Sequence, residues 1–101
     1  MTKSELIEQL SKKQIYLPFQ DVERAVNLLV NKMAEALGSG QRIEIRGFGA
    51  FSLVEHRARK GRNPKTGETV FIPQRQSIRF KAGLELAKRV NDSARQYKIT
   101  Q

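Results

Sequence analysis

The chain has 101 residues, with 19 Lys or Arg against 10 Asp or Glu for a net charge of +9, one histidine and no cysteine. That length fits a single domain, and the lack of cysteine excludes a disulfide framework and thiolate chemistry. One histidine and scattered carboxylates give no metal-ligand spacing, so we expect no metal and no other cofactor. No apolar signal segment opens the chain and no stretch reaches about 18 apolar residues, so we expect a soluble protein.

Residues 1–40 are predicted to form a helical body. Thr2 and Glu5 have the spacing of a capping box, which predicts the start of a first helix. Pro18 suits the first turn of a second helix, since its missing N–H would have no partner there. An apolar stripe at intervals of three or four residues then predicts a face that packs against another helix or a partner subunit. The stripe consists of Val22, Val26, Leu29, Met33 and Leu37.

Residues 41–56 are predicted to form the start of a sheet. Polar and apolar residues alternate from Arg42 to Arg46, so a strand here has two isoleucines on one face and three charges on the other. Neighbours on one face lie about 7 Å apart, so Glu44 can hold either arginine. The following Gly-Phe-Gly predicts a tight connection with Phe48 turned into the core, and Phe51 resumes the alternation in a second strand.

Residues 57–81 are predicted to form a basic arm. They contain eight Lys or Arg and one acid, Glu68, and so account for +7 of the net charge of +9. A turn from Asn63 to Gly67 separates an outgoing strand that continues through His56 to Lys60 from a return strand between Thr69 and Phe80. Each side can span roughly 30–40 Å, beyond the radius of about 13 Å expected for a compact body. Such an arm is suited to lie along a polyanion.

Residues 82–92 are predicted to form a short last helix with Leu84, Ala87 and Val90 directed inward, followed by a polar tail at 93–101. Pro73 interrupts the return strand and must lie where no ladder hydrogen bond is needed. Without the arm, the body has a small core, so we expect a partner subunit to supply apolar contacts. The predicted fold class is α+β: two N-terminal helices, a three-stranded antiparallel sheet that extends into a long β-ribbon arm, and a short C-terminal helix.

The combination of GFGAF, a basic hairpin and GRNPKTG resembles the bacterial HU and integration host factor family of DNA-bending proteins over residues 1–92. MTKSELIE and RIEIRGFG look most like the beta-type subunit of integration host factor. The resemblance implies an intertwined dimer with a helical base, whose two arms wrap double-stranded DNA through the minor groove. It also implies a second subunit, either an alpha-type subunit in a heterodimer or another copy in a homodimer. The implied location is the nucleoid in the bacterial cytoplasm, with roles in recombination, replication, transcription and nucleoid organisation.

The resemblance also assigns candidate DNA-binding residues. Pro64 matches the proline that wedges between base pairs, since a rigid apolar ring can replace lost base stacking. Arg46, positioned by Glu44, matches an arginine that reads the minor groove, and Arg42 lies on the same face. Lys3, Ser4 and Lys81 match positions that contact backbone phosphate. The candidate contacts of the arm are Arg57, Arg59, Lys60, Arg62, Asn63, Lys65, Thr66, Arg75 and Arg79.

Other interpretations of these residues remain open. Pro64 could be an ordinary turn proline, the charges around Glu44 a surface ion ladder, and the basic arm a guard against aggregation. His56 is interpreted as a solvated strand residue. Two alternative functions are an HU-like homodimer without sequence preference and an RNA-binding component of a larger particle. An enzyme is not expected, because no motif combines a nucleophile, a base and an orienting group.

Overall fold

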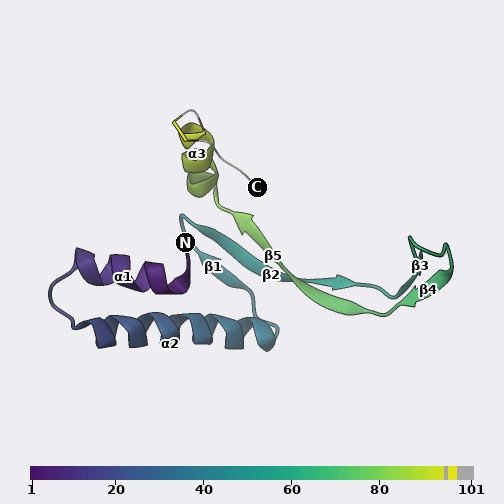
Figure 1. Cartoon of the computed structure of the whole chain (residues 1–101), viewed down its shortest axis with the longest axis horizontal. Coiled ribbons are helices and arrows are strands. Elements are labelled where there is room, and N and C mark those ends of the chain that lie inside the picture. Colours follow the sequence, from purple (N-terminus) through teal and green to yellow (C-terminus); the bar gives the residue numbers. More distant parts are fainter. Residues whose placement is uncertain (95, 98–101) are drawn as a thin grey trace.

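The computed structural model describes residues 1–94, 96 and 97. Its order of elements confirms the α+β prediction, with two helices, an antiparallel sheet that continues into a ribbon, and a last helix (Figure 1). Most of the predicted polar tail at 93–101 lies outside the described residues. The elements are α1 (Lys3–Lys13), α2 (Phe19–Gly38), β1 (Ile43–Ile45), β2 (Gly49–His56), β3 (Arg59–Arg62), β4 (Thr69–Ile72), β5 (Arg75–Ala82) and α3 (Leu84–Ser93).

The two N-terminal helices begin where local signals place them. The predicted capping box forms: the Thr2 hydroxyl accepts from the Glu5 N–H at 3.2 Å, and the Glu5 carboxylate accepts from the Thr2 N–H at 3.4 Å. Pro18 is the residue just before α2 rather than a member of its first turn, and its carbonyl accepts from the Asp21 N–H at 3.0 Å. Both helix starts therefore satisfy amides that the helices themselves leave unpaired.

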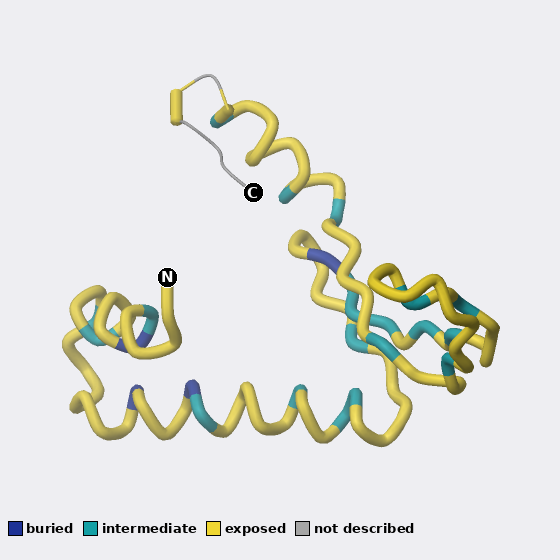
Figure 2. Tube along the Cα trace, turned by 45° about the vertical axis from the view of Figure 1, so that its right-hand side comes forward, coloured by how far each residue is buried: buried dark blue, intermediate teal, exposed yellow. Residues whose placement is uncertain are grey.

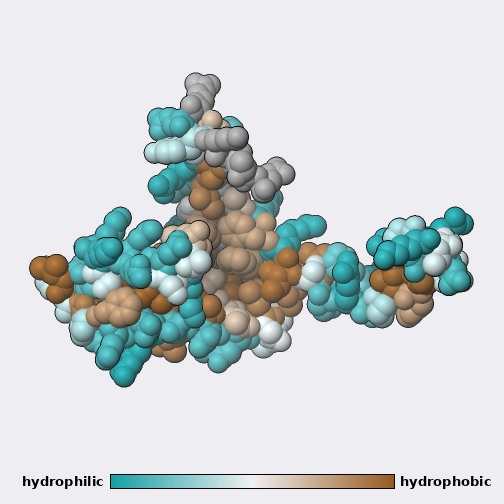
Figure 3. Space-filling model, in the orientation of Figure 1, coloured by the Kyte–Doolittle hydropathy of each residue, from teal (hydrophilic) through white to brown (hydrophobic). Residues whose placement is uncertain are grey.

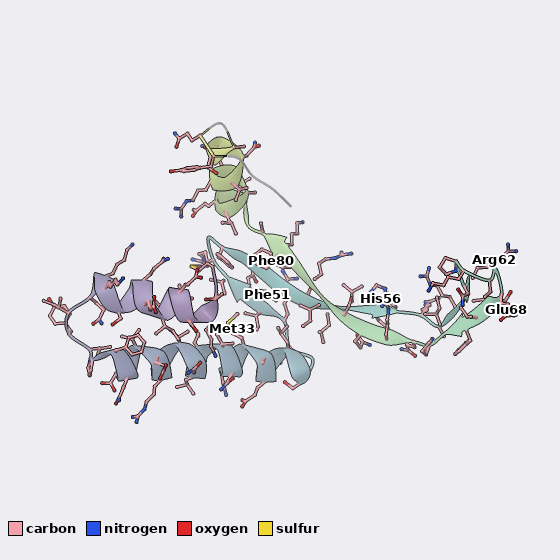
Figure 4. The ribbon with its side chains drawn as sticks, viewed as in Figure 1. Met33, Phe51, His56, Arg62, Glu68 and Phe80 are labelled. Carbon is pink, nitrogen blue, oxygen red and sulfur yellow. The ribbon has the colours of Figure 1, made fainter. Side chains whose placement is uncertain are left out.

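The helical body has a very small core in the single chain. Within the described residues, the buried apolar side chains are Ile7, Val22 and Val26, where α1 packs on α2. Met33, which follows Val22 and Val26 on the same stripe, points from α2 toward the sheet (Figure 4). Leu29 is 62% exposed in the single chain, so of the two packing partners predicted for the stripe, another helix or a partner subunit, the helix α1 does not cover this residue. The second half of α2 extends beyond α1 (Figure 2), and the described residues leave Leu29 largely uncovered.

The sheet is antiparallel in the order β1-β2-β5. Gly47 turns the chain between β1 and β2 with φ +82°, and the Phe48 N–H donates to the Ile45 carbonyl at 3.0 Å. Gly49 is needed for close approach, because a Cβ there would lie 2.6 Å from the Lys81 carbonyl oxygen. Phe48 packs against Phe80 with ring centroids 5.4 Å apart. It is nevertheless 44% exposed, so its predicted burial is incomplete.

The arm is not one continuous ribbon. Both predicted strands are interrupted, the outgoing one at residues 57–58 and the return one at 73–74, and we call these four residues the junction. Beyond the junction, β3 and β4 form a separate two-stranded sheet, which we call the outer ribbon. Pro73 lies in the junction, outside both ladders, as predicted. The radius of gyration is 19.3 Å, against about 13 Å for a compact chain of this length.

The last helix projects from the sheet (Figure 1), and near its start the Glu85 carboxylate lies 3.1 Å from where a Cβ of Gly47 would be. Leu84 is 88% exposed and Val90 48%, and Ala87 is also exposed, so the prediction that these residues point inward is wrong for the single chain. Among the described residues, nothing buries the apolar side chains that line one side of this helix. In the part of the chain that is described, no helix is both long and apolar enough to cross a membrane.

Candidate nucleic-acid interface

The register of the strands separates the sheet into an apolar and a polar face. Residues paired across an antiparallel ladder lie on the same face, so Phe51 and Phe80 share one face with Leu53 and Ile78. Phe51 and Phe80 pack with ring centroids 4.7 Å apart (Figure 4). The opposite face, which we call the polar face, carries most of the predicted contacts of the sheet. Its members are Glu44, Ala50, Ser52, Val54, His56, Arg75, Ser77, Arg79 and Lys81.

The body end of the polar face forms an open hollow of about 870 Å³. The structure brings together here five residues predicted to contact DNA, four of them cations: Arg42, Glu44, Arg46, Arg79 and Lys81. The hollow is also lined by small residues, which occupy little of its space, among them Gly47, Gly49 and Ala50. Lys3 and Ser4 do not line this hollow, and they lie exposed in the first turn of α1.

Glu44 does not hold its neighbouring arginines in the free chain. Among the described residues the one ion pair within 4 Å joins Lys32 and Glu35 on α2. The strand ends at Ile45, so Arg46 already belongs to the turn and leaves the strand alternation on which the prediction relied. The predicted contact of Glu44 with Arg42 or Arg46 is therefore not formed in the free chain, although all three residues line the same hollow.

The tip of the arm is an ordered turn. The Asn63 side chain accepts from the Lys65 N–H at 2.9 Å, and the Asn63 carbonyl accepts from the Gly67 N–H at 2.7 Å. The Thr66 hydroxyl accepts from the Glu68 N–H at 3.3 Å. Gly67 has φ +72°, which favours glycine. These bonds hold Pro64 in an exposed position at the end of the arm, between the exposed cations Arg62 and Lys65.

The outer ribbon also has two different faces. One face carries Arg59 and Gly61 opposite Ile72 and Val70. The Ile72 side chain packs over Gly61, since its Cδ1 lies only 2.7 Å from where a Cβ of Gly61 would be. The other face carries Lys60 and Arg62 opposite Phe71 and Thr69. Apolar and hydrophilic surfaces therefore adjoin at the end of the arm (Figure 3). Candidate cations lie on both faces of the outer ribbon.

The junction contains a second hollow, of about 500 Å³. Three predicted arm contacts line it, Arg57, Arg59 and Arg75, together with Glu55 and His56. His56 is half-buried and its Nε2 lies 2.7 Å from the Ser77 hydroxyl, so the interpretation of it as a solvated residue is wrong. Sequence reasoning missed this residue because its neighbours come from the return strand. The period of two, combined with the pairing register, would have placed it on the polar face.

Comparisons with known proteins agree with this geometry. The model of the bacterial DNA-binding protein family matches residues 1–91. Integration host factor subunit beta of Halorhodospira halophila is 55% identical over 96 residues, which cover 95% of this chain and 94% of that protein. The same subunit of Alkalilimnicola ehrlichii is 57% identical over 91 residues, which cover 90% and 91%. Among solved structures, an Anabaena HU–DNA cocrystal matches with a TM-score of 0.78 and 31% identity over 89% of this chain and 97% of that one.

The chain therefore belongs to the bacterial HU and integration host factor family of DNA-binding proteins, as its motifs predict. Within that family, its curated relatives named above are beta subunits of integration host factor. Members of the family are architectural proteins that bind DNA and catalyse no reaction, so the prediction that this chain is not an enzyme is confirmed.

Proposed function

We propose that this chain is one subunit of a dimer that wraps DNA with two β-ribbon arms and bends it by inserting Pro64 between base pairs. The observation that carries the proposal is the tip, where an exposed proline is fixed by hydrogen bonds between two exposed cations. A rigid apolar ring can replace lost base stacking, while Arg62 and Lys65 reach the flanking phosphates. Unstacking costs a few kcal/mol per step and is offset by the contacts that bent DNA allows.

The remaining candidates divide between the arm and the body. The arm contacts proposed are Arg57, Arg59, Lys60, Arg62, Asn63, Lys65, Thr66, Arg75 and Arg79. At the body, Arg46 with Glu44 and Arg42 gives sequence preference, and Lys3, Ser4 and Lys81 bind backbone phosphate. The domain divides accordingly into a helical body at 1–40, a sheet at 41–56, a DNA-binding arm at 57–81, a helix at 82–92 and a tail. We place the protein in the bacterial nucleoid, where DNA bending serves recombination, replication, transcription and compaction.

The second subunit is either an alpha-type chain or another copy of this chain. One observation favours the alternative of an HU-like homodimer without sequence preference: Glu44 makes no ion pair with Arg42 or Arg46 in the free chain. An arginine that is not held in advance must be ordered when DNA binds, which reduces the free energy that its contact with a preferred site can add. In the first function Arg46 reads sequence, and in the HU-like alternative it only binds phosphate. Replacement of Arg46 can distinguish the two roles.

The bend is tested by replacing Pro64 with alanine. Energy transfer between dyes at the two ends of a duplex should show a much smaller bend for Pro64→Ala, while its affinity falls less. Lys65→Ala is the matched control at the same tip, because it removes a phosphate contact and leaves the wedge. The control should lose affinity and keep the bend angle of the saturated complex.

The same titrations at several salt concentrations test the wrapping. If about half of the sixteen basic residues on two arms meet phosphate, log K should fall against log salt with a slope of about −7. Fourfold more salt then weakens binding about 10⁴-fold. A slope near −1, or an unchanged bend in Pro64→Ala, would rule out wrapping or the wedge respectively.

A further inference from the structure

His56 lies where the arm leaves the sheet and is the only histidine in the chain. It is the last residue of β2 and pairs with Arg75, the first residue of β5. Paired residues share a face, so its side chain lies on the polar face in line with Ser77 and Arg79. Figure 4 shows it at the start of the arm, well away from the tip that carries Arg62. The imidazole therefore lies between the body hollow and the tip, on the face that the body hollow also occupies.

The hydrogen bonding of His56 suits both protonation states. Its Nε2 lies 2.7 Å from the Ser77 hydroxyl, and no other hydrogen bond to the ring is found within the described residues. A neutral ring can accept a hydrogen bond from the Ser77 hydroxyl at Nε2. A protonated ring instead donates from Nε2 to the hydroxyl oxygen, which leaves the hydroxyl O–H able to donate to another group. The N–H at Nδ1 is a donor in both states, because a neutral ring that accepts at Nε2 carries its proton at Nδ1. Protonation thus adds the Ser77 hydroxyl as a second donor for an anion, and a positive charge, without breaking the bond between the two side chains.

The charged groups around the ring make the site attractive to phosphate. Facing the junction hollow are Glu55 from β2, Arg57 from the junction, Arg59 from β3 and Arg75 from β5. Gln74 in the junction donates a hydrogen bond to the Glu55 carboxylate, so this one acid already has a partner. Glu55 pairs with Gln76 and therefore belongs to the opposite face of the ladder. The hollow that His56 lines therefore carries three guanidinium groups against one carboxylate that already has a partner, an excess of positive charge that favours a phosphate.

We propose that His56 contacts a DNA phosphate and that its protonation strengthens DNA binding in mildly acidic conditions. The inference rests on the proposed function, in which the arm lies along DNA. Histidine is the side chain whose charge ordinarily changes between pH 5 and 8. A phosphate oxygen stabilises the protonated ring, so the complex binds more protons than the free protein. By linkage, affinity for DNA then rises as the pH falls through this range.

Three proteins measured on one duplex at constant ionic strength test the proposal. Between pH 8 and pH 5.5, the wild type should gain about tenfold in affinity for each His56 in the complex, the equivalent of about 1.4 kcal/mol. His56→Gln should keep the weaker affinity throughout, and His56→Lys, with a permanent charge, the tighter one. The salt slope of the wild type should be more negative at pH 5.5 by about 0.9 per chain, while both variants keep theirs.

A measurement on the unmodified protein guards against a variant that folds poorly. Because the chain has one histidine, its Cε1–H proton gives a single assignable NMR signal, to be titrated with and without DNA. Bound DNA should move the midpoint of that titration upward in pH. An unchanged midpoint, or an equal pH response of the wild type and His56→Gln, would overturn the proposal. DNA bending and a steep salt slope at pH 8 would persist in that case, whereas failure of the proposed function would remove both.

Discussion

Arg46 lies in the turn just after β1, at the edge of the body hollow and outside the regular ladder. If it reads sequence, its replacement by alanine should reduce affinity for a preferred duplex by about 1–3 kcal/mol more than for random DNA. The difference between the two affinities should therefore narrow. Equal losses on the two duplexes would leave Arg46 as a phosphate contact only.

A control arginine on the body makes that measurement interpretable. Arg24 is exposed on α2 and does not line the hollow, so Arg24→Ala removes the same charge away from the site. It should lower the affinities for preferred and random DNA by equal and small amounts. A change in selectivity with Arg24→Ala would instead indicate that net charge, rather than a local contact, sets the preference.

The residues that sequence reasoning placed well are those whose partners lie nearby in the chain. Thr2 and Glu5 cap α1, Pro73 lies outside the ladder, and the turn from Asn63 to Gly67 forms. His56 and Glu44 were misjudged because their surroundings depend on the pairing register and on the length of a strand. Those properties are set by contacts that are distant in sequence.

At the scale of elements, the connection between β1 and β2 depends on how closely Gly49 approaches β5. A Cβ at Gly49 would meet the Lys81 carbonyl oxygen and the Phe80 ring, each at 2.6 Å. Gly49→Ala should therefore lower the free energy of unfolding by about 1–3 kcal/mol, as forced overpacking does. Urea unfolding followed by circular dichroism measures this loss.

Gly38 offers the matched control for Gly49. It is the last residue of α2, and nothing lies within 4 Å of where its Cβ would be. Gly38→Ala should leave stability unchanged or raise it by about 0.5–1 kcal/mol, because alanine restricts the unfolded chain. Equal destabilisation by the two substitutions would contradict the role assigned to the close contact at Gly49.

The elements differ in how far sequence could predict them. The helices and the hairpin follow from local caps, periodicity and turn residues, so their bounds were nearly right. The interruption of both arm strands could not be read from alternation, since it depends on residues 57–58 and 73–74, which lie opposite one another across the ribbon and make no ladder pairs. The apolar side of α3 is exposed in the single chain, contrary to the prediction. An apolar pattern indicates that a helix face packs against something, but it does not indicate whether that surface belongs to the same chain or to a partner subunit.

At the scale of the whole molecule, the chain exposes too much surface to be a stable monomer. Its accessible surface is 9456 Å², whereas a compact monomer of 11.5 kDa exposes about 5,800 Å². The excess is larger than the roughly 800 Å² that each partner buries in a standard interface. Exposed apolar residues mark where a second subunit would pack: Leu28 and Leu29 on α2, Ile78 and Phe80 on β5, and Leu84 and Val90 on α3.

We expect the second subunit to be required for folding. The thermal midpoint should rise with protein concentration, because association stabilises the folded state by mass action. Differential scanning calorimetry over a hundredfold range of concentration, with subunit mass measured by sedimentation, provides the test. A folded monomer with a constant midpoint would contradict the proposed dimer. If the chain pairs only with an alpha-type subunit, the midpoint should rise when that subunit is added.

The junction divides the arm into two separately paired parts, the β2-β5 ladder next to the body and the outer ribbon of β3 and β4. Four residues there make no ladder pairs, so a change of direction costs least at that point, and the hydrogen bonds of β2 with β5 and of β3 with β4 can remain intact. In the proposed complex, the outer ribbon would then follow the DNA while the sheet keeps its place on the body. We expect such a complex to accommodate a range of bend angles, so that a distribution of DNA shapes describes it better than a single curvature.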